Sequence, residues 1–98
     1  MDERRQLILG ELKAECAENK LYEFEYYWEI WGVNWYPRFI EFATGYQLKL
    51  TFDDISEEDL NYLVEIGELE VVKVYDLDEM QYEFNRIRYR LKNKDIPV

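Results

Sequence analysis

One stretch of fifteen residues, Leu21–Trp35 (LYEFEYYWEIWGVNW), contains seven aromatic side chains and three glutamates, and it constrains the fold more than any other segment. Its side chains alternate with a period of two, which is the period of a β-strand. One face carries Tyr22, Phe24, Tyr26, Trp28 and Ile30, and the other carries Glu23, Glu25, Tyr27, Glu29 and Trp31. We therefore expect a long strand over Leu21–Val33, with its apolar face toward the core and its acidic, partly aromatic face outward.

Length and composition favour one globular domain. The chain has 98 residues, of which 48% are hydrophobic and 35% charged, so residues 1–98 can form a single domain with one modest core. A single cysteine and no histidine exclude an internal disulfide framework and an ordinary Cys/His metal site. No apolar run approaches the ~20 residues that cross a bilayer, and the start MDERRQ has no signal-peptide character. These features predict an intracellular, cytoplasmic protein.

The charge is strongly negative and unevenly distributed. The net charge is −10, yet the last nineteen residues, 80–98, are basic overall. A negative field repels nucleic acid and anionic membranes, and it favours basic partner surfaces. A simpler interpretation is that the acidity only keeps an aromatic-rich chain soluble. The composition, rich in charge but with only one serine, two threonines and three glutamines, also follows the trend of proteins from hot environments.

The remaining N-terminal half predicts one helix and two more strands. Apolar residues recur at helical spacing over Asp2–Asn19, which indicates a helix. Short alternating segments at Arg38–Ala43 and Tyr46–Phe52 flank a turn at Thr44-Gly45. Together with the first strand, these two segments predict an antiparallel meander.

The segment Asp53–Gly67 predicts a second helix. Ser56 is the expected N-cap, the next three residues are acidic, and Gly67 is the expected C-terminal cap. The side chains expected to face the core are Leu60, Leu63, Val64 and Ile66.

Two strands complete the chain, at Leu69–Tyr75 and Met80–Lys92. The apolar parity of the last strand changes midway, so a β-bulge is expected near Asn85-Arg86. The tail, residues 93–98, is expected to be loose. The fold class is therefore α+β, with order α-β-β-β-α-β-β and an antiparallel twisted sheet whose helices pack on one face.

The outward glutamates of the first strand have natural counterparts in the last one. Arg86, Arg88 and Arg90 alternate along the final strand, and opposite charges across a ladder stabilise it. We expect these two strands to pair. The pairing could be made within one chain or between two subunits, and the sequence leaves both open.

No catalytic, metal or cofactor site is predicted. The acidic runs at 53–59 and 76–79 are explained by helix capping and by a polar turn. Glu23, Glu25 and Glu29 have a spacing that some glycosidases use, but a chain of this size has little material for a deep cleft. Nucleophilic triads and glycine-rich phosphate loops are also missing. The chain is accordingly expected not to be an enzyme.

The hypothesis is a non-catalytic protein-binding module, homodimeric, without cofactors, membrane partners or small-molecule substrates. It would be an acidic viral or phage accessory or inhibitor protein that engages a basic host protein surface. One alternative is an immunity or antitoxin-type protein neutralising a basic toxin. Another is a homodimer that binds nucleic acid through the arginine- and aromatic-rich last strand. The candidate partner-binding residues are Glu23, Glu25, Tyr27, Glu29, Trp31, Trp35 and Tyr36, and the strand-pairing or interface residues are Arg86, Arg88 and Arg90.

Overall fold

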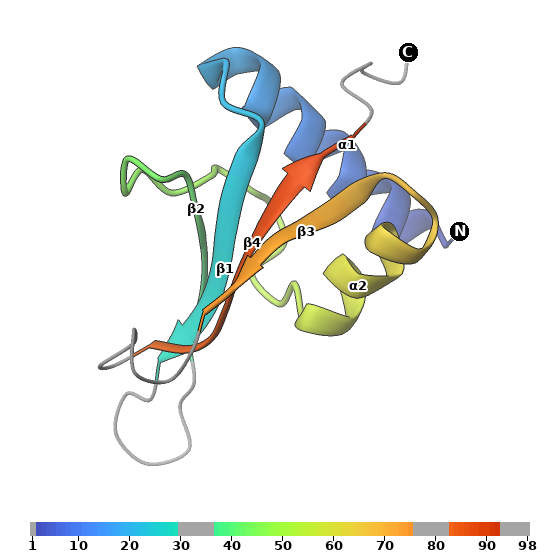
Figure 1. Cartoon of the computed structure of the whole chain (residues 1–98). Coiled ribbons are helices and arrows are strands. Elements are labelled where there is room, and N and C mark those ends of the chain that lie inside the picture. Colours follow the sequence, from blue (N-terminus) through green and yellow to red (C-terminus); the bar gives the residue numbers. More distant parts are fainter. Residues whose placement is uncertain (1, 30–36, 76–82, 93–98) are drawn as a thin grey trace.

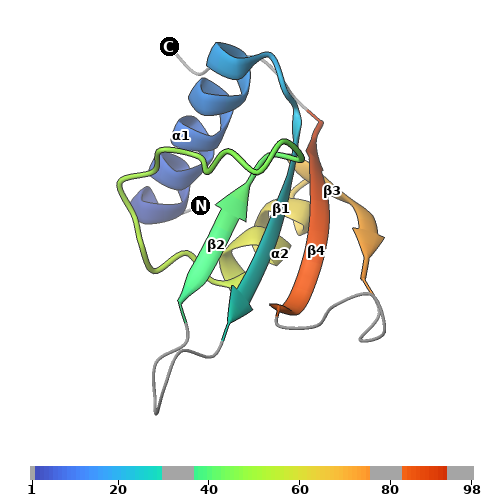
Figure 2. The ribbon, with the colours of Figure 1, turned by 90° about the vertical axis from the view of Figure 1, so that its left-hand side faces the viewer.

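A computed structural model describes residues 2–29, 37–75 and 83–92 of the chain. The elements are α1 (Glu3–Asn19), β1 (Glu23–Glu29), β2 (Arg38–Glu41), α2 (Glu57–Glu65), β3 (Leu69–Val74) and β4 (Glu83–Leu91). The four strands form one antiparallel sheet with the order β2-β1-β4-β3. Both helices lie against the same face of this sheet (Figure 1; Figure 2). The expected α+β class with helices on one face is confirmed.

Helix α1 follows the expected range closely. The Asp2 carboxylate accepts a hydrogen bond from the Arg5 backbone N–H at 2.7 Å, which caps the first turn. The helix buries Ile8, Leu9, Leu12 and Cys16 in the core. Burial raises the pKa of the Cys16 thiol to about 11, so this group is neutral and packs as a small apolar side chain.

Helix α2 begins with a reciprocal cap. The Asp59 backbone N–H donates to Ser56 Oγ at 3.4 Å, and the Ser56 backbone N–H donates to Asp59 Oδ2 at 3.0 Å. Gly67 has a φ of +84°, a conformation that costs glycine little, and it follows the last turn as expected. The expectation that Ile66 faces the core is wrong. The helix ends at Glu65, and Ile66 is 41% exposed.

The two helices are joined by ion pairs at their N-terminal ends. Arg4 Nη1 lies 2.9 Å from Asp59 Oδ1, and Arg5 Nε lies 3.1 Å from the same oxygen. Burial alone would raise the pKa of Asp59, but hydrogen bonds from the Ser56 backbone, Arg4 and Arg5 hold it below its ordinary value. The cap of α2 therefore also fixes the position of α1.

The expected third strand, Tyr46–Phe52, is wrong. The preceding turn at Thr44-Gly45 is present, and Gly45 has a φ of +87°. Pairing with β2 then lasts only briefly: the Phe42 N–H donates to Tyr46 O at 2.9 Å, and the Leu48 N–H donates to Ile40 O at 3.1 Å.

Beyond Leu48 the chain turns from β2 toward α1. The Lys49 backbone N–H donates to Glu15 Oε1 at 2.9 Å, and the Thr51 N–H donates to Glu11 Oε1 at 2.7 Å. Two helix carboxylates thus accept the hydrogen bonds that a strand would have given to β2. In a strand over this segment Tyr46 would share the inward face with Leu48, but it is 47% exposed. The observed order is therefore α-β-β-α-β-β.

The expected bulge in the last strand is confirmed. Trp28 pairs with Phe84 and Tyr26 pairs with Ile87, so β4 contributes one more residue than β1 between these two positions. That extra residue falls at Asn85-Arg86. A second irregularity lies between Val71 and Lys73 of β3. The bulge in β4 leaves Ile87, Tyr89 and Leu91 on the helix side of the sheet, where all three are buried.

The remaining strand boundaries differ slightly from expectation. Strand β2 ends at Glu41 instead of Ala43, and β3 ends at Val74 instead of Tyr75. The expected strand segments at 30–33 and 80–82, and the tail 93–98, lie outside the described residues. The core sits between the helices and the sheet, where Phe24 of β1 stacks on Tyr89 of β4 with 5.9 Å between ring centroids.

Replacing the N-cap tests the assignment of α2. Ser56→Ala removes the acceptor for the Asp59 backbone N–H, and we expect the free energy of unfolding to fall by about 1 kcal/mol. The measurement is urea unfolding followed by far-ultraviolet circular dichroism. Glu58→Ala is the matched control on the same turn, because the Glu58 side chain is exposed and makes no ion pair within the described residues. A control that loses as much stability as Ser56→Ala would contradict the assigned cap.

Candidate functional site

The sheet face opposite the helices holds most of the residues singled out from the sequence. Neither of the two described helices covers this face, which we call the open face (Figure 1; Figure 2). The strand registers bring acidic, basic and aromatic side chains from all four strands to it, because directly paired residues point to the same side of a sheet. Its described members are Glu23, Glu25, Tyr27 and Glu29 of β1, Phe39 and Glu41 of β2, Arg88 and Arg90 of β4 with Arg86 beside the bulge, Glu70 and Lys73 of β3, and Tyr75.

Glu25 lies at the centre of the open face and is only 4% exposed. Arg86 contacts its Oε1, with Nε at 2.8 Å and Nη2 at 2.6 Å. Arg88 contacts its Oε2, with Nε at 2.9 Å and Nη2 at 2.7 Å. The Tyr75 hydroxyl also donates to Oε2. Both carboxylate oxygens are therefore occupied by donors from the same chain.

Aromatic rings enclose the Arg86 side chain. Its guanidinium carbon lies 4.4 Å from the centroid of the Tyr27 ring and 5.7 Å from that of Tyr75. Tyr27 in turn stacks on Phe39, with 5.0 Å between centroids, and its hydroxyl donates to Glu41 Oε2 at 3.2 Å. Cation–π contacts of this kind are strongest where water is excluded, so the rings reinforce the ion pair beneath them.

The electrostatics of this cluster keep Glu25 ionised. Burial by itself would raise the pKa of Glu25, but hydrogen bonds from Tyr75, Arg88 and Arg86 hold it below the ordinary value. Burial and the nearby Glu41 raise the pKa of Tyr27 to about 12. Burial and the bond to Glu25 also raise the pKa of Tyr75. At neutral pH the centre is thus a carboxylate between two guanidinium groups and two neutral phenols.

The rim of the open face carries a weaker ion-pair ladder. Arg90 Nη2 lies 3.3 Å from Glu23 Oε2, and Arg90 Nη1 lies 3.0 Å from Glu70 Oε1. All three side chains are more than 40% exposed, so solvent screens these pairs and each contributes little.

The expected pairing of the glutamate and arginine strands is confirmed within one chain. Glu23 is registered opposite Arg90, and Glu25 opposite Arg88. Of the two options that the sequence left open, pairing within one chain and pairing between subunits, these two strands show the first.

The candidate partner-binding residues fall into three groups. Glu25 and Tyr27 are buried and already have partners, and Glu23 and Glu29 are half-buried at the rim. Trp31, Trp35 and Tyr36 lie outside the described residues. Three further members of this cluster, Glu41, Phe39 and Tyr75, were not predicted from the sequence. Once the register of β1 and β2 is known, the alternation of side chains along β2 places Glu41 and Phe39 on the open face. No sequence signal places Tyr75 beside Glu25.

A second acidic surface is found where the two helices begin. It consists of Glu3 in the first turn of α1, Asp53 before α2, and Glu57 and Glu58 in the first turn of α2; we call it the helix-start surface. The neighbouring Arg4 and Arg5 make their ion pairs with Asp54, Asp59 and Asp2. Within the described residues, none of the four members of the helix-start surface has an ion-pair partner.

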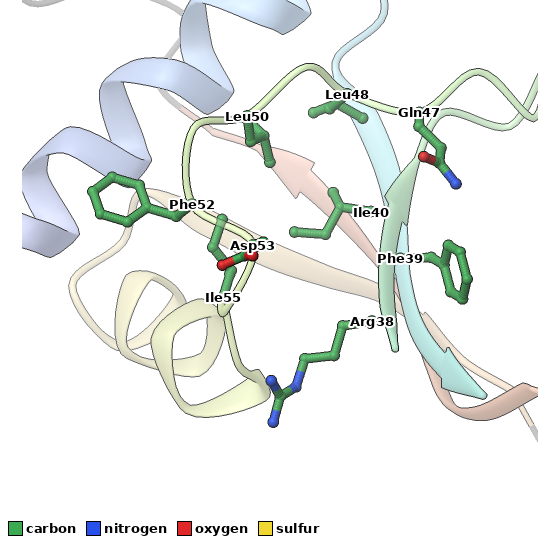
Figure 3. Close-up of a pocket in the computed structure, with 9 residues that line it drawn as sticks. All are labelled: Arg38, Phe39, Ile40, Gln47, Leu48, Leu50, Phe52, Asp53 and Ile55. Carbon is green, nitrogen blue, oxygen red and sulfur yellow. The ribbon is translucent and has the colours of Figure 1, made fainter. Parts of the chain in front are cut away.

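A small hollow lies where the chain leaves β2. It has a volume of about 200 Å³ and is bounded by Ile40, Leu48 and Leu50, which point toward one another in Figure 3, with Arg38 and Asp53 near its lower end. Pockets that bury small organic ligands usually enclose roughly 300–1,000 Å³. The hollow is therefore a packing gap left by the strand that does not form.

Within the described part of the chain, no group of three or more carboxylate or thiol side chains is arranged to hold a metal ion. Neither α1 nor α2 is long and apolar enough to cross a membrane.

Comparisons with protein-family models, with curated proteins and with solved structures found no match to this chain.

Removing the charge of Glu25 tests the centre of the open face. Glu25→Gln leaves the half-buried Arg86 and Arg88 beside a neutral amide, and breaking a buried ion pair on one side costs about 3–5 kcal/mol. We expect a loss of unfolding free energy near the lower end of that range, because both arginines keep some access to water. Chemical denaturation monitored by tryptophan fluorescence gives the value.

Glu23→Gln is the matched control on the same strand. Its ion pair with Arg90 is exposed, so the expected loss is below about 1 kcal/mol. Equal losses in the two variants would contradict the central role of Glu25.

Proposed function

We propose that this protein is a non-catalytic protein-binding module that engages a basic protein surface through its helix-start surface. The observation that carries the proposal is the contrast between the two acidic regions. On the open face, arginines of the same chain neutralise the central carboxylates. At the helix-start surface, the exposed carboxylates of Glu3, Asp53 and Glu58 and the half-buried Glu57 have no ion-pair partner among the described residues and remain available to a partner's cations.

Long-range electrostatics support the same role. The chain carries a net charge of −10, and a field of this sign accelerates the association of a cationic partner while it repels nucleic acid. The rim residues Glu23 and Glu29 remain candidates for a second contact region, together with Trp31, Trp35 and Tyr36, which lie outside the described residues.

In biological terms, we propose a small accessory or inhibitor protein, such as a virus or phage encodes to occupy the basic site of a host protein. An immunity or antitoxin-type protein that neutralises a basic toxin would use the same surface chemistry. Nucleic-acid binding through the last strand is less well supported, because Arg86 and Arg88 would have to give up their contacts with Glu25 to meet phosphates.

The test is capture of partners from lysate of the native host cell, on immobilised wild-type chain at low and moderate salt. We expect a basic protein to be retained, and its retention to weaken as salt rises. The double variant Asp53→Asn/Glu58→Gln should reduce the affinity for that protein by on the order of tenfold, since it removes two charges from the contact.

The matched control is Glu18→Gln/Glu65→Gln, which removes the same charge from exposed positions at the other ends of the helices. It should bind nearly as well as the wild type. Equal losses in both double variants would show that only overall charge matters and would refute the helix-start surface. Failure to retain any basic protein would refute the proposed function itself.

A further inference from the structure

Strand β3 forms an edge of the sheet with a pronounced apolar character. Its neighbour on one side is β4, and no described segment pairs with it on the other side. At the opposite edge, residues 46–48 cover part of β2. Val71, Val72 and Val74 are 44%, 38% and 64% exposed. An exposed apolar edge is a template for pairing with another strand.

The backbone of β3 is oriented for such pairing. Lys92 N–H donates to Glu68 O, Tyr75 N–H donates to Arg86 O, and Leu91 N–H is directed to Tyr22 O on the far side of β4. Because backbone groups alternate between the two sides of a strand, Leu69 and Val74 direct their N–H and C=O groups away from β4. These groups can form hydrogen bonds with a further strand.

The charges of β3 select one partner and one register. An antiparallel second copy of β3, related by a two-fold axis between Val71 and Val72, would place Glu70 opposite Lys73 of that copy, and Lys73 opposite Glu70. Both side chains belong to the open face, because Glu70 is registered opposite Arg90, with which it also forms an ion pair, and Lys73 is registered opposite Arg88. The same register sets Leu69 opposite Val74, so that the outward backbone groups of the two strands meet.

Neighbouring registers lack this complementarity. A two-fold axis at Glu70 or at Lys73 would place like charges opposite each other, and an axis at Val72 would place Val71 opposite Lys73. The bulge and the lysine of β3 are features that protect an edge from indiscriminate pairing. Both the bulge and Lys73 are compatible with a partner strand that places a glutamate opposite Lys73.

We propose that the chain forms a two-fold symmetric dimer by antiparallel pairing of β3 with β3 of a second copy, which joins the two four-stranded sheets into one. The two Glu70–Lys73 pairs across the junction specify its register. The contact is small, so the dimer is in concentration-dependent equilibrium with the monomer.

Charge exchange at these two positions tests the register directly. Sedimentation equilibrium at physiological salt should show that the wild type dimerises in the upper micromolar range. Lys73→Glu alone and Glu70→Lys alone each replace two attractive pairs with two repulsive ones, so each should dimerise more weakly by on the order of tenfold or more. An equimolar mixture of the two variants restores both attractive pairs and should form a heterodimer at the wild-type concentration.

The mixing step distinguishes a lost contact from a damaged fold, because only folded variants can recombine. Lys49→Glu, which makes the same charge change at an exposed position outside β3, is the control and should dimerise as the wild type does. The proposal is overturned if the wild type stays monomeric at millimolar concentration, if the single variants dimerise normally, or if their mixture does not recombine.

Discussion

The buried carboxylate of Glu25 is the interaction on which the arrangement of the sheet depends. A charge that is 4% exposed persists only if donors satisfy it, and the donors here come from β4 and from Tyr75, the residue after β3. Satisfying it requires β1 and β4 to pair in one register and the bulge to place Arg86 on the same face as Arg88. A shift by one residue would move both arginines to the core side. The ion pair therefore specifies which sheet forms, in addition to whatever it contributes to stability.

The ion pairs of Glu25 with Arg86 and Arg88 also change the functional interpretation of the acidic face of β1. The sequence suggested a surface of carboxylates and rings presented to a partner. In the structure, the same carboxylates and rings contact arginines of their own chain, and the centre of the open face is close to electrically balanced. Unneutralised acids remain instead where the helices begin, and an apolar strand remains at the β3 edge. The two proposed contacts use separate parts of the molecule, so one can fail without the other.

Short sequence patterns correctly predicted the structural features that depend on residues close together in the chain. The Ser56 cap, the Gly67 terminus, the bulge at Asn85-Arg86 and the pairing of glutamate and arginine strands all follow from short patterns. The prediction of a strand at Tyr46–Phe52 was wrong because the alternation of its side chains carries no information about distant residues. Glu11 and Glu15 lie more than thirty residues earlier and accept backbone hydrogen bonds from this segment. The burial of Glu25 was missed for a related reason. It depends on Tyr75 and on a strand order, β2-β1-β4-β3, that periodicity does not encode.

A nuclear magnetic resonance titration of the Glu25 side-chain carboxyl carbon in the folded protein tests this account most directly. The contacts with Arg86, Arg88 and Tyr75 predict that Glu25 titrates below 4.5, the ordinary pKa of a glutamate. A glutamate on a solvated sheet face would titrate near that ordinary value, and one buried without partners would titrate above it. A measured pKa at or above 4.5 would contradict the central ion pair and, with it, the assignment of the open face as an internally neutralised surface.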